Sequence, residues 1–244
     1  MDESLEIRHT HISRQFNAEL QTIHTQVLEM GGLVQQQLAD ALAALLNNDG
    51  EIADRVIQTD HKVNAMEVMI DETCTHILAR RQPAAGDLRM VIAVIKTITD
   101  LERIGDEAKR VARMAGHKVS AQPHHPRTYV GVGIEHMGVL VQKMLERALD
   151  SFARMDVETA LAVVHEDEKV DREYDSIIRQ LITYMMEDPR SIPSALDIMW
   201  SARALERIGD RSRNICEYVV YFVKGKDIRH VSLEKAKAEI GLSS

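Results

Sequence analysis

The chain has 244 residues, of which 4% are aromatic and 28% charged, and its formal net charge is −8 at pH 7. The low aromatic content is untypical of large β-sheets, and the acidic balance argues against a nucleic-acid-binding protein, which normally presents a basic face. The sequence has no apolar run of about 18 residues that would span a membrane, and its polar start does not resemble a signal peptide. We therefore expect a helical, cytoplasmic protein.

Apolar residues recur at helical spacing through the first half of the chain. Residues three or four apart share one face of a helix. The first such stripe comprises Val27, Met30, Val34, Leu38, Leu42 and Leu45. The second comprises Val56, Val63, Met66, Ile70 and Ile77, and the third comprises Val91, Val94, Ile95, Ile98 and Leu101. Asp49 is a good N-cap for the second helix and Pro83 ends it, so three long helices are predicted.

The second half of the chain repeats the first. Residues 137–170 match residues 30–63 at 15 of 34 positions, with a constant offset of 107 and no gap. The hexapeptide LERIGD occurs at 101–106 and again at 205–210. A unit of this length is a duplicated domain rather than a solenoid repeat. We predict an all-α fold of two three-helix bundles, with six long helices in all.

The boundaries of the two bundles follow from the repeat. We place the first bundle at residues 1–118, the second at 128–227 and a C-terminal tail at 228–244. The proline-containing segment SAQPHHPR at 120–127 is the expected junction. In the second bundle Asp156 occupies the N-cap position that Asp49 has in the first.

Each copy of LERIGD carries two acids one helical turn apart. The pairs are Glu102 with Asp106 and Glu206 with Asp210. Acids at this spacing lie on the same side of a helix and repel each other unless something positive lies between them. The glycine inside each pair, Gly105 or Gly209, weakens the helix by about 1 kcal/mol relative to alanine. It suggests that another backbone or a ligand approaches closely there.

Further acids with the same spacing lie on the preceding helix of each half. They are Glu67 with Asp71, and Asp171 with Asp175. If the second and third helices are antiparallel neighbours, these acids face those of LERIGD and form an all-oxygen cation site, suited to Mg²⁺, Mn²⁺ or Ca²⁺ and open to iron. The repeat aligns Glu67 with Tyr174, so the second set of acids is not an exact copy of the first.

A second interpretation of the same acids is that they pair with arginines. Asp106 and Arg110 are four residues apart, a spacing that allows an ion pair on a helix surface. The other nearby arginines are Arg103, Arg207, Arg211 and Arg213. Spacing does not decide between salt bridges and metal ligands.

Motifs of the common enzyme classes are absent from the sequence. There is no phosphate-binding G-x-x-x-x-G-K-[ST] and no G-x-S-x-G nucleophile elbow. The Glu-x-x-His spacing of di-iron bundles occurs only at Glu6–His9, in a polar segment. Cys74 and Cys216 fall within helical patterns and are expected to be buried thiols, not a disulfide. We expect no catalytic residues.

Several segments resemble the PhoU family of phosphate-specific transport system accessory proteins. The resemblance extends over residues 9–231. The segments that carry it are HISRQFNAEL at 11–20, RQPAAGDLR at 81–89, DLERIGDEAKR at 100–110, RQLITYMMEDPRSIPSAL at 179–196 and LERIGDRSRNICEY at 205–218.

The resemblance implies a pseudo-twofold pair of three-helix bundles and a homodimer. It implies metal binding, with iron, zinc, magnesium or manganese as candidates. The ligands on the third helix of each half would be Glu102/Asp106 and Glu206/Asp210. The ligands on the second helix of each half would be Glu67/Asp71 and Asp171/Asp175. It further implies a non-enzymatic negative regulator of the phosphate-starvation response, which links the ATPase subunit of the phosphate ABC transporter to a sensor histidine kinase. Contact with the membrane would run through those partners, and no direct nucleic-acid binding is implied. A carboxylate metalloenzyme and a metal-storage bundle are the alternatives.

Overall fold

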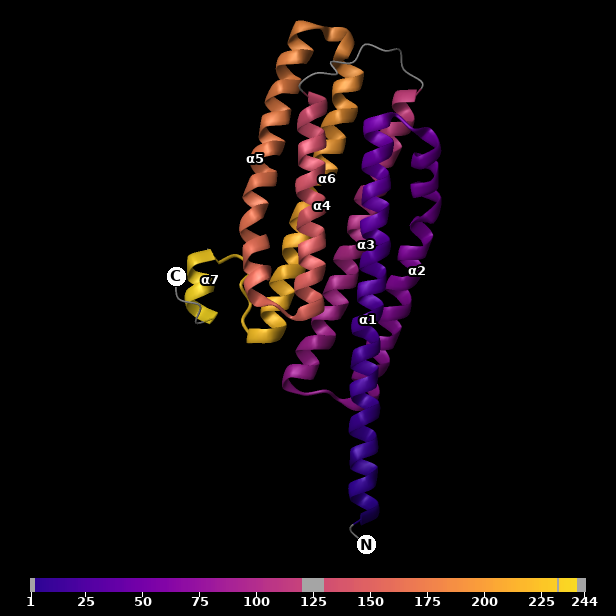
Figure 1. The fold of residues 1–244 in the computed structure, drawn as a ribbon, viewed down its shortest axis with the longest axis vertical. Helices are drawn as coiled ribbons and strands as arrows, with labels where there is room; N and C mark the ends of the chain where they lie inside the picture. Colours follow the sequence, from indigo (N-terminus) through magenta and orange to yellow (C-terminus); the bar gives the residue numbers. More distant parts are fainter. Residues whose placement is uncertain (1–2, 120–129, 232, 241–244) are drawn as a thin grey trace.

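The computed structural model describes residues 3–119, 130–231 and 233–240, and it is helical in all of its regular parts (Figure 1). The six long helices are α1 (Glu3–Asn47), α2 (Gly50–Arg81), α3 (Ala85–Val119), α4 (Val130–Arg154), α5 (Val157–Glu187) and α6 (Ile192–Lys224). A 3-10 turn, η1 (Pro189–Ser191), precedes α6, and a short helix, α7 (Leu233–Ile240), follows it. The predicted fold class is therefore confirmed.

The helix boundaries follow from local chemistry. Asp49 accepts hydrogen bonds from the backbone N–H groups of Glu51 and Ile52, at 3.0 and 3.1 Å. Asp156 caps α5 in the same manner. These caps satisfy N–H groups that have no partner within the helix. The helix α2 ends at Arg81, just before Pro83, as predicted.

The six helices form two antiparallel bundles that lie side by side (Figure 1). One bundle contains α1–α3 and the other contains α4–α6, and the two are joined mainly through α3 and α6. All the predicted stripe residues are buried apart from Met66 and Ile95, which are partly buried against the core. The expected junction at 120–127 lies outside the described residues, and the bundle boundaries remain a prediction.

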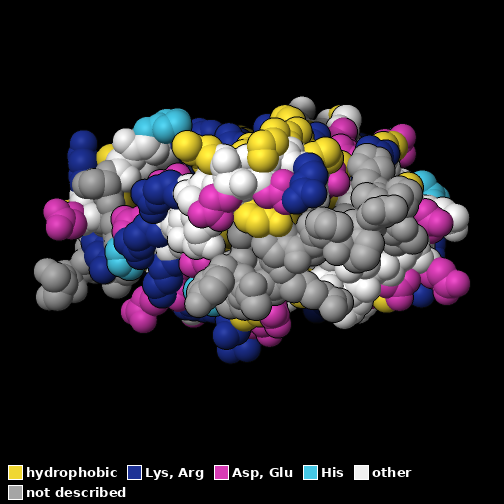
Figure 2. Space-filling view, turned by 90° about the horizontal axis from the view of Figure 1, so that it is seen from above, with side chains coloured by type: hydrophobic (Ala, Val, Ile, Leu, Met, Phe, Trp, Pro, Cys, Tyr) yellow, Lys and Arg dark blue, Asp and Glu magenta, His cyan; other side chains and the backbone are white. Residues whose placement is uncertain are grey.

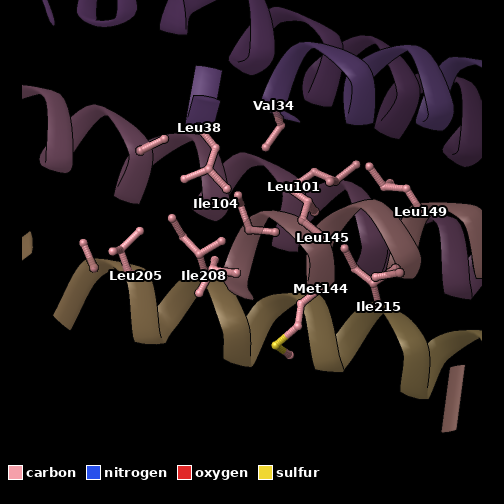
Figure 3. Packing of buried hydrophobic residues seen from close by; sticks show 14 of the residues in the cluster. Val34, Leu38, Leu101, Ile104, Met144, Leu145, Leu149, Leu205, Ile208 and Ile215 are labelled. Carbon is pink, nitrogen blue, oxygen red and sulfur yellow. The ribbon is translucent and has the colours of Figure 1, made fainter. Parts of the chain in front are cut away.

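The two bundles share one hydrophobic core. Figure 3 shows Leu101 and Ile104 of α3 close to Ile208 of α6, with Leu145 of α4 among them. Leu205, the α6 counterpart of Leu101, is also fully buried. The apolar positions of both LERIGD copies therefore form the centre of the molecule, which explains why the hexapeptide occurs twice.

A reciprocal contact between α1 and α4 shows the symmetry of the duplication. Gly31 of α1 faces Leu149 of α4, and Gly138 of α4 faces Leu42 of α1. The two glycines are 107 residues apart, as are the two leucines. A Cβ atom at Gly31 would lie 2.7 Å from Leu149 Cδ2, so the helices approach too closely there for a larger residue. The two halves are thus related by a pseudo-twofold axis.

The surfaces of the two halves differ more than their cores. Figure 2 looks onto the end of the molecule where α5 turns into α6, and hydrophobic side chains gather there. Met186, near the end of α5, is 79% exposed, and Trp200, in the first half of α6, is 54% exposed. The residue 107 positions before Met186 is Ala79, and the residue 104 positions before Trp200 is Lys96. Among the described helices, none combines the length and apolar character needed to cross a lipid bilayer.

Candidate functional site

The acids of α2 and α3 meet in the first half of the molecule. Burial raises the pKa of Glu67 above its usual range, and the negative charges of Asp71 and Asp106 raise it further. Burial also raises the pKa of Glu102, with Asp106 and Glu67 adding to the effect. The pKa of each glutamate is thus raised by acids on the neighbouring helix as well as by burial.

A lysine ammonium lies within this first cluster. Lys109 of α3 donates one very short hydrogen bond to Asp60 Oδ2 and another, 2.6 Å long, to Asp106 Oδ1. Asp60 is 5% exposed, and its Oδ1 accepts a 3.0 Å hydrogen bond from Gln37 Nε2. The lysine thus joins a buried aspartate of α2 to the second acid of LERIGD.

The acids of α5 and α6 meet in the second half. Partial desolvation raises the pKa of Asp171, and the charge of Asp210 raises it further. Burial raises the pKa of Glu206 in the same way, with contributions from Asp210 and Asp171. This glutamate has an ion pair, since Arg203 Nη1 lies 2.6 Å from Glu206 Oε1, whereas Glu102 has none with any residue that the structure describes.

An arginine lies within the second cluster. The guanidinium of Arg213 makes a very short hydrogen bond to Asp167 Oδ2 and lies 3.4 Å from Asp210 Oδ1. Its Nε lies 3.7 Å from Glu217 Oε1. Burial raises the pKa of Asp167 to about 6, and the arginine counteracts part of that rise. Arg213 therefore makes ion pairs with three acids, one on α5 and two on α6.

The same arrangement has thus been built twice. Asp60 and Asp167 are 107 residues apart, and Lys109 and Arg213 are 104 apart, so both pairs occupy equivalent positions in the repeat. In each half, a buried aspartate from the middle helix is joined by a cationic side chain to the aspartate that ends LERIGD. A buried carboxylate without such a partner would be costly, which gives the cation a structural role.

The glycine of LERIGD makes room for this buried aspartate. A Cβ atom at Gly105 would lie 3.0 Å from Gln37 Oε1 and 3.7 Å from Asp60 Oδ1. At Gly209 it would lie 3.3 Å from Val170 and 3.4 Å from Asp167 Oδ1. The close approach predicted at the glycine is therefore real, but the approaching groups in this structure are side chains.

Basic residues do pair with the predicted acids, although the partner expected for Asp106 was wrong. Its partner is Lys109, three residues away, whereas Arg110 pairs with Glu107 at 3.2 Å. The side chain of Lys109 reaches both Asp106 and Asp60 across the α2–α3 seam, and this second contact depends on tertiary structure.

Two of the other arginines that were candidate partners for the LERIGD acids make hydrogen bonds between the two halves instead. Arg207 Nη1 donates to Glu107 Oε1 at 3.0 Å. Arg211 Nη1 donates to the buried Asp100 at 3.3 Å, and the hydroxyl of Tyr218 donates to the same carboxylate at 2.8 Å. These bonds link α3 to α6 and stabilise the contact between the bundles.

Asp71 and Asp175, the second acid of each pair on α2 and α5, lie farther from the buried part of the clusters. Asp71 and Asp175 are both exposed on α2 and α5. Asp71 raises the pKa of Glu67, and Asp175 raises the pKa of Asp171. They therefore lie at the edge of each cluster.

The residue types fit a hard cation, but their arrangement places basic side chains among the acids. Within the described ranges, no three His, Cys, Asp or Glu side chains converge closely enough to hold a metal ion. The donors are oxygens, as Mg²⁺ and Mn²⁺ prefer. Among the eight predicted acids, Glu206 has a buried carboxylate oxygen, Oε2, without a hydrogen-bond partner in the described structure, and the buried amide oxygen Gln37 Oε1 of α1 also has none there.

Sequence reasoning missed Asp60 and Lys109 as members of the first cluster. A signal was present, because Asp60 is identical to Asp167 in the aligned repeat and Lys109 matches a basic residue, Arg213. Both thiols that were expected to be buried and free, Cys74 and Cys216, are so.

A family model described as the PhoU domain matches the chain twice, at residues 27–115 and 134–219. The two matches fall on α1–α3 and α4–α6, the two halves that the pseudo-twofold axis relates. The chain belongs to the PhoU family.

Named relatives and solved structures agree with the PhoU assignment. The chain is 57% identical over 228 residues to a phosphate-specific transport system accessory protein PhoU of Serratia marcescens, covering 92% of each chain. It is 55% identical over 221 residues to PhoU of Escherichia coli K12, covering 91% of this chain and 90% of that protein.

The crystal structure of PhoU from Pseudomonas aeruginosa, at 50% identity, superposes with a TM-score of 0.82 and covers 86% of this chain and 100% of that one. PhoU from Streptococcus pneumoniae, at 31% identity, superposes with a TM-score of 0.79 and covers 87% and 98%. The PhoU family consists of accessory and regulatory proteins, so the expectation of a non-enzymatic protein agrees with the family.

Proposed function

We propose that this PhoU protein is an accessory protein of a phosphate-specific transport system and a negative regulator of the phosphate-starvation response. The observation that carries the proposal is the 57% identity, over nearly the whole chain, to a protein that bears this name. The proposed mechanism is that of an adaptor between the ATPase subunit of the phosphate ABC transporter and a sensor histidine kinase. A cytoplasmic location and a homodimer are part of the proposal.

The physical character of the chain supports an adaptor. Long helices with a shared core give extended rigid faces of the kind that an adaptor presents to its partners. The two thiols are buried, and burial raises the pKa of each to about 12, so neither is a nucleophile. The two halves have similar cores and different ends, which suits a protein with two different partners.

A deletion strain tests the regulatory role. Without this protein, a phosphate-starvation reporter is expected to stay on in phosphate-rich medium, and a plasmid-borne copy is expected to restore repression. Crosslinking and co-purification from the complemented strain should recover the transporter ATPase and the kinase. Normal repression in the deletion strain would contradict the proposed function.

We also propose that the eight predicted acids bind divalent or ferric cations, which replace Lys109 and Arg213 among the acids. The support is the all-oxygen donor set and the orphaned Glu206 Oε2. Metal content should then fall in Glu102→Gln/Asp106→Asn. A control is available on α4, where Glu146 and Asp150 have the same spacing but lie outside both clusters.

This experiment also separates the alternatives. Many metal ions per chain would favour the metal-storage bundle, and turnover of a phosphate or oxygen substrate that depends on Glu102 would favour the metalloenzyme. Equal metal content in Glu102→Gln/Asp106→Asn and in the Glu146→Gln/Asp150→Asn control would contradict metal binding by the first cluster. It would leave the adaptor role standing, because that role depends on surfaces.

A further inference from the structure

The two acidic clusters differ in the cations that they already contain. In the first half, Lys109 pairs with Asp60 and Asp106, and Glu102 has no ion pair with a described residue. In the second half, Arg213 and Arg203 both lie among the acids. The counterpart of Arg203, 104 residues earlier, is the neutral Thr99. Among the described residues, one basic side chain therefore makes ion pairs within the first cluster and two do so within the second.

The chemistry of the two bridging cations also differs. The ammonium of Lys109 is a point charge on a flexible chain, whereas the guanidinium of Arg213 is a planar fork whose donors lie in fixed directions. Lys109 contacts two carboxylates, and Arg213 contacts the carboxylates of three acids, one of them the buried Asp167. Removing the arginine from its cluster therefore breaks more ion-pair contacts than removing the lysine.

The first cluster also has an additional oxygen. Gln37 is 6% exposed, its Nε2 donates to Asp60, and its Oε1 has no hydrogen-bond partner. The counterpart 107 residues later is the buried Met144, which offers no oxygen. The first cluster therefore contains a buried neutral oxygen donor for which the second has no counterpart at the same position.

We propose that Lys109 and Arg213 are resident counter-ions that a metal cation must displace, and that the first cluster exchanges its counter-ion for a metal cation more readily than the second. The inference rests on the proposed metal binding and names the residues that limit it. An entering divalent cation takes over the charge balance of Asp60 and Asp106 when the lysine side chain swings out to solvent. In the second cluster, two guanidiniums oppose the same exchange.

Titration of the full-length protein with Mn²⁺, followed by calorimetry and by the electron paramagnetic resonance of free Mn²⁺, tests the inference. The parent is expected to bind Mn²⁺ more tightly in the first half than in the second, so Glu102→Gln/Asp106→Asn removes the tighter binding and Glu206→Gln/Asp210→Asn keeps it. Lys109→Met should tighten Mn²⁺ binding by about tenfold or more, since residues around metal ligands commonly change affinity by 10- to 100-fold. Lys143→Met, the same change at an exposed site on α4, should leave affinity unchanged.

A second variant guards against loss of folding in Lys109→Met. Lys109→Arg keeps the positive charge and gives the first cluster the guanidinium of the second, so Mn²⁺ binding should weaken by about tenfold or more. Arg213→Lys should tighten Mn²⁺ binding in the second half. The melting temperature of Lys109→Met should be low in chelator and recover with Mn²⁺, because the cation replaces the lost ammonium.

The outcomes separate the two proposals. Mn²⁺ binding of equal strength in both halves would overturn the inference and leave metal binding intact. Unchanged Mn²⁺ affinity in both Lys109→Met and Lys109→Arg would also overturn it. If the parent binds no Mn²⁺ and Lys109→Met binds it, the counter-ion role stands. If neither binds Mn²⁺, metal binding and the inference both fail, while repression of the starvation reporter remains a separate question.

Discussion

Two adjacent glycines of α1 offer a matched test of how the halves are joined. Replacing either Gly31 or Gly32 by alanine favours the helix by about 1 kcal/mol. Gly32 is open, with nothing within 4 Å of an added Cβ, whereas at Gly31 that atom would lie 2.7 and 2.9 Å from the two methyl carbons of Leu149. The difference between the two variants therefore isolates the contact between α1 and α4.

The magnitude follows from the geometry of that contact. Both methyl groups of Leu149 are too close, so exchanging them by rotation gives no relief, and the leucine is 6% exposed. Overpacking of this kind costs about 1–3 kcal/mol. Gly32→Ala should raise the free energy of unfolding by about 1 kcal/mol. Gly31→Ala should be less stable than Gly32→Ala by about 1–3 kcal/mol.

Denaturant unfolding and thermal melting measure the difference between these variants. For a chain of this size, 1 kcal/mol corresponds to about 2–4 °C in melting temperature. Leu149→Ala should cost about 2–5 kcal/mol alone, and in that background Gly31→Ala should stabilise the protein, because the clash has gone. Equal stability of Gly31→Ala and Gly32→Ala would refute the close approach of the two halves at this point.

The remaining predictions concern the thiols, a surface ion pair and a helix cap. Cys74 and Cys216 should resist alkylation at pH 8 in the native protein and react in denaturant, because burial raises each pKa to about 12. Arg229 lowers the pKa of Asp227 to about 2, so the stabilising effect of this pair is present above about pH 4 and is lost as the pH falls toward 2. Since both side chains are more than 40% exposed, Asp227→Asn should cost under about 1 kcal/mol at pH 7 and nothing at pH 2, as melting curves would show. Asp49→Ala should cost about 1 kcal/mol in denaturant unfolding through loss of the α2 cap.

The sequence by itself determined the helices and their duplication. Apolar residues at spacings of three and four define the buried faces, and aspartate and proline mark helix ends through local chemistry that acts within a few residues. The repeat offsets then predicted two equivalent halves, and the reciprocal contacts of Gly31 and Gly138 show that they are equivalent in space. Periodicity and caps are local properties, so they can be read from a linear sequence.

Only the tertiary structure decided what surrounds the acids of LERIGD. Spacing along one helix suggested Arg110 as the partner of Asp106, but Lys109 is the partner, and it also reaches Asp60 of α2, 49 residues away. Spacing along α6 did not show that Arg213 joins Asp167 of α5 to Asp210. The partner of a long basic side chain depends on which helix packs beside it and at what register, and the burial of both halves in one shared core sets that register.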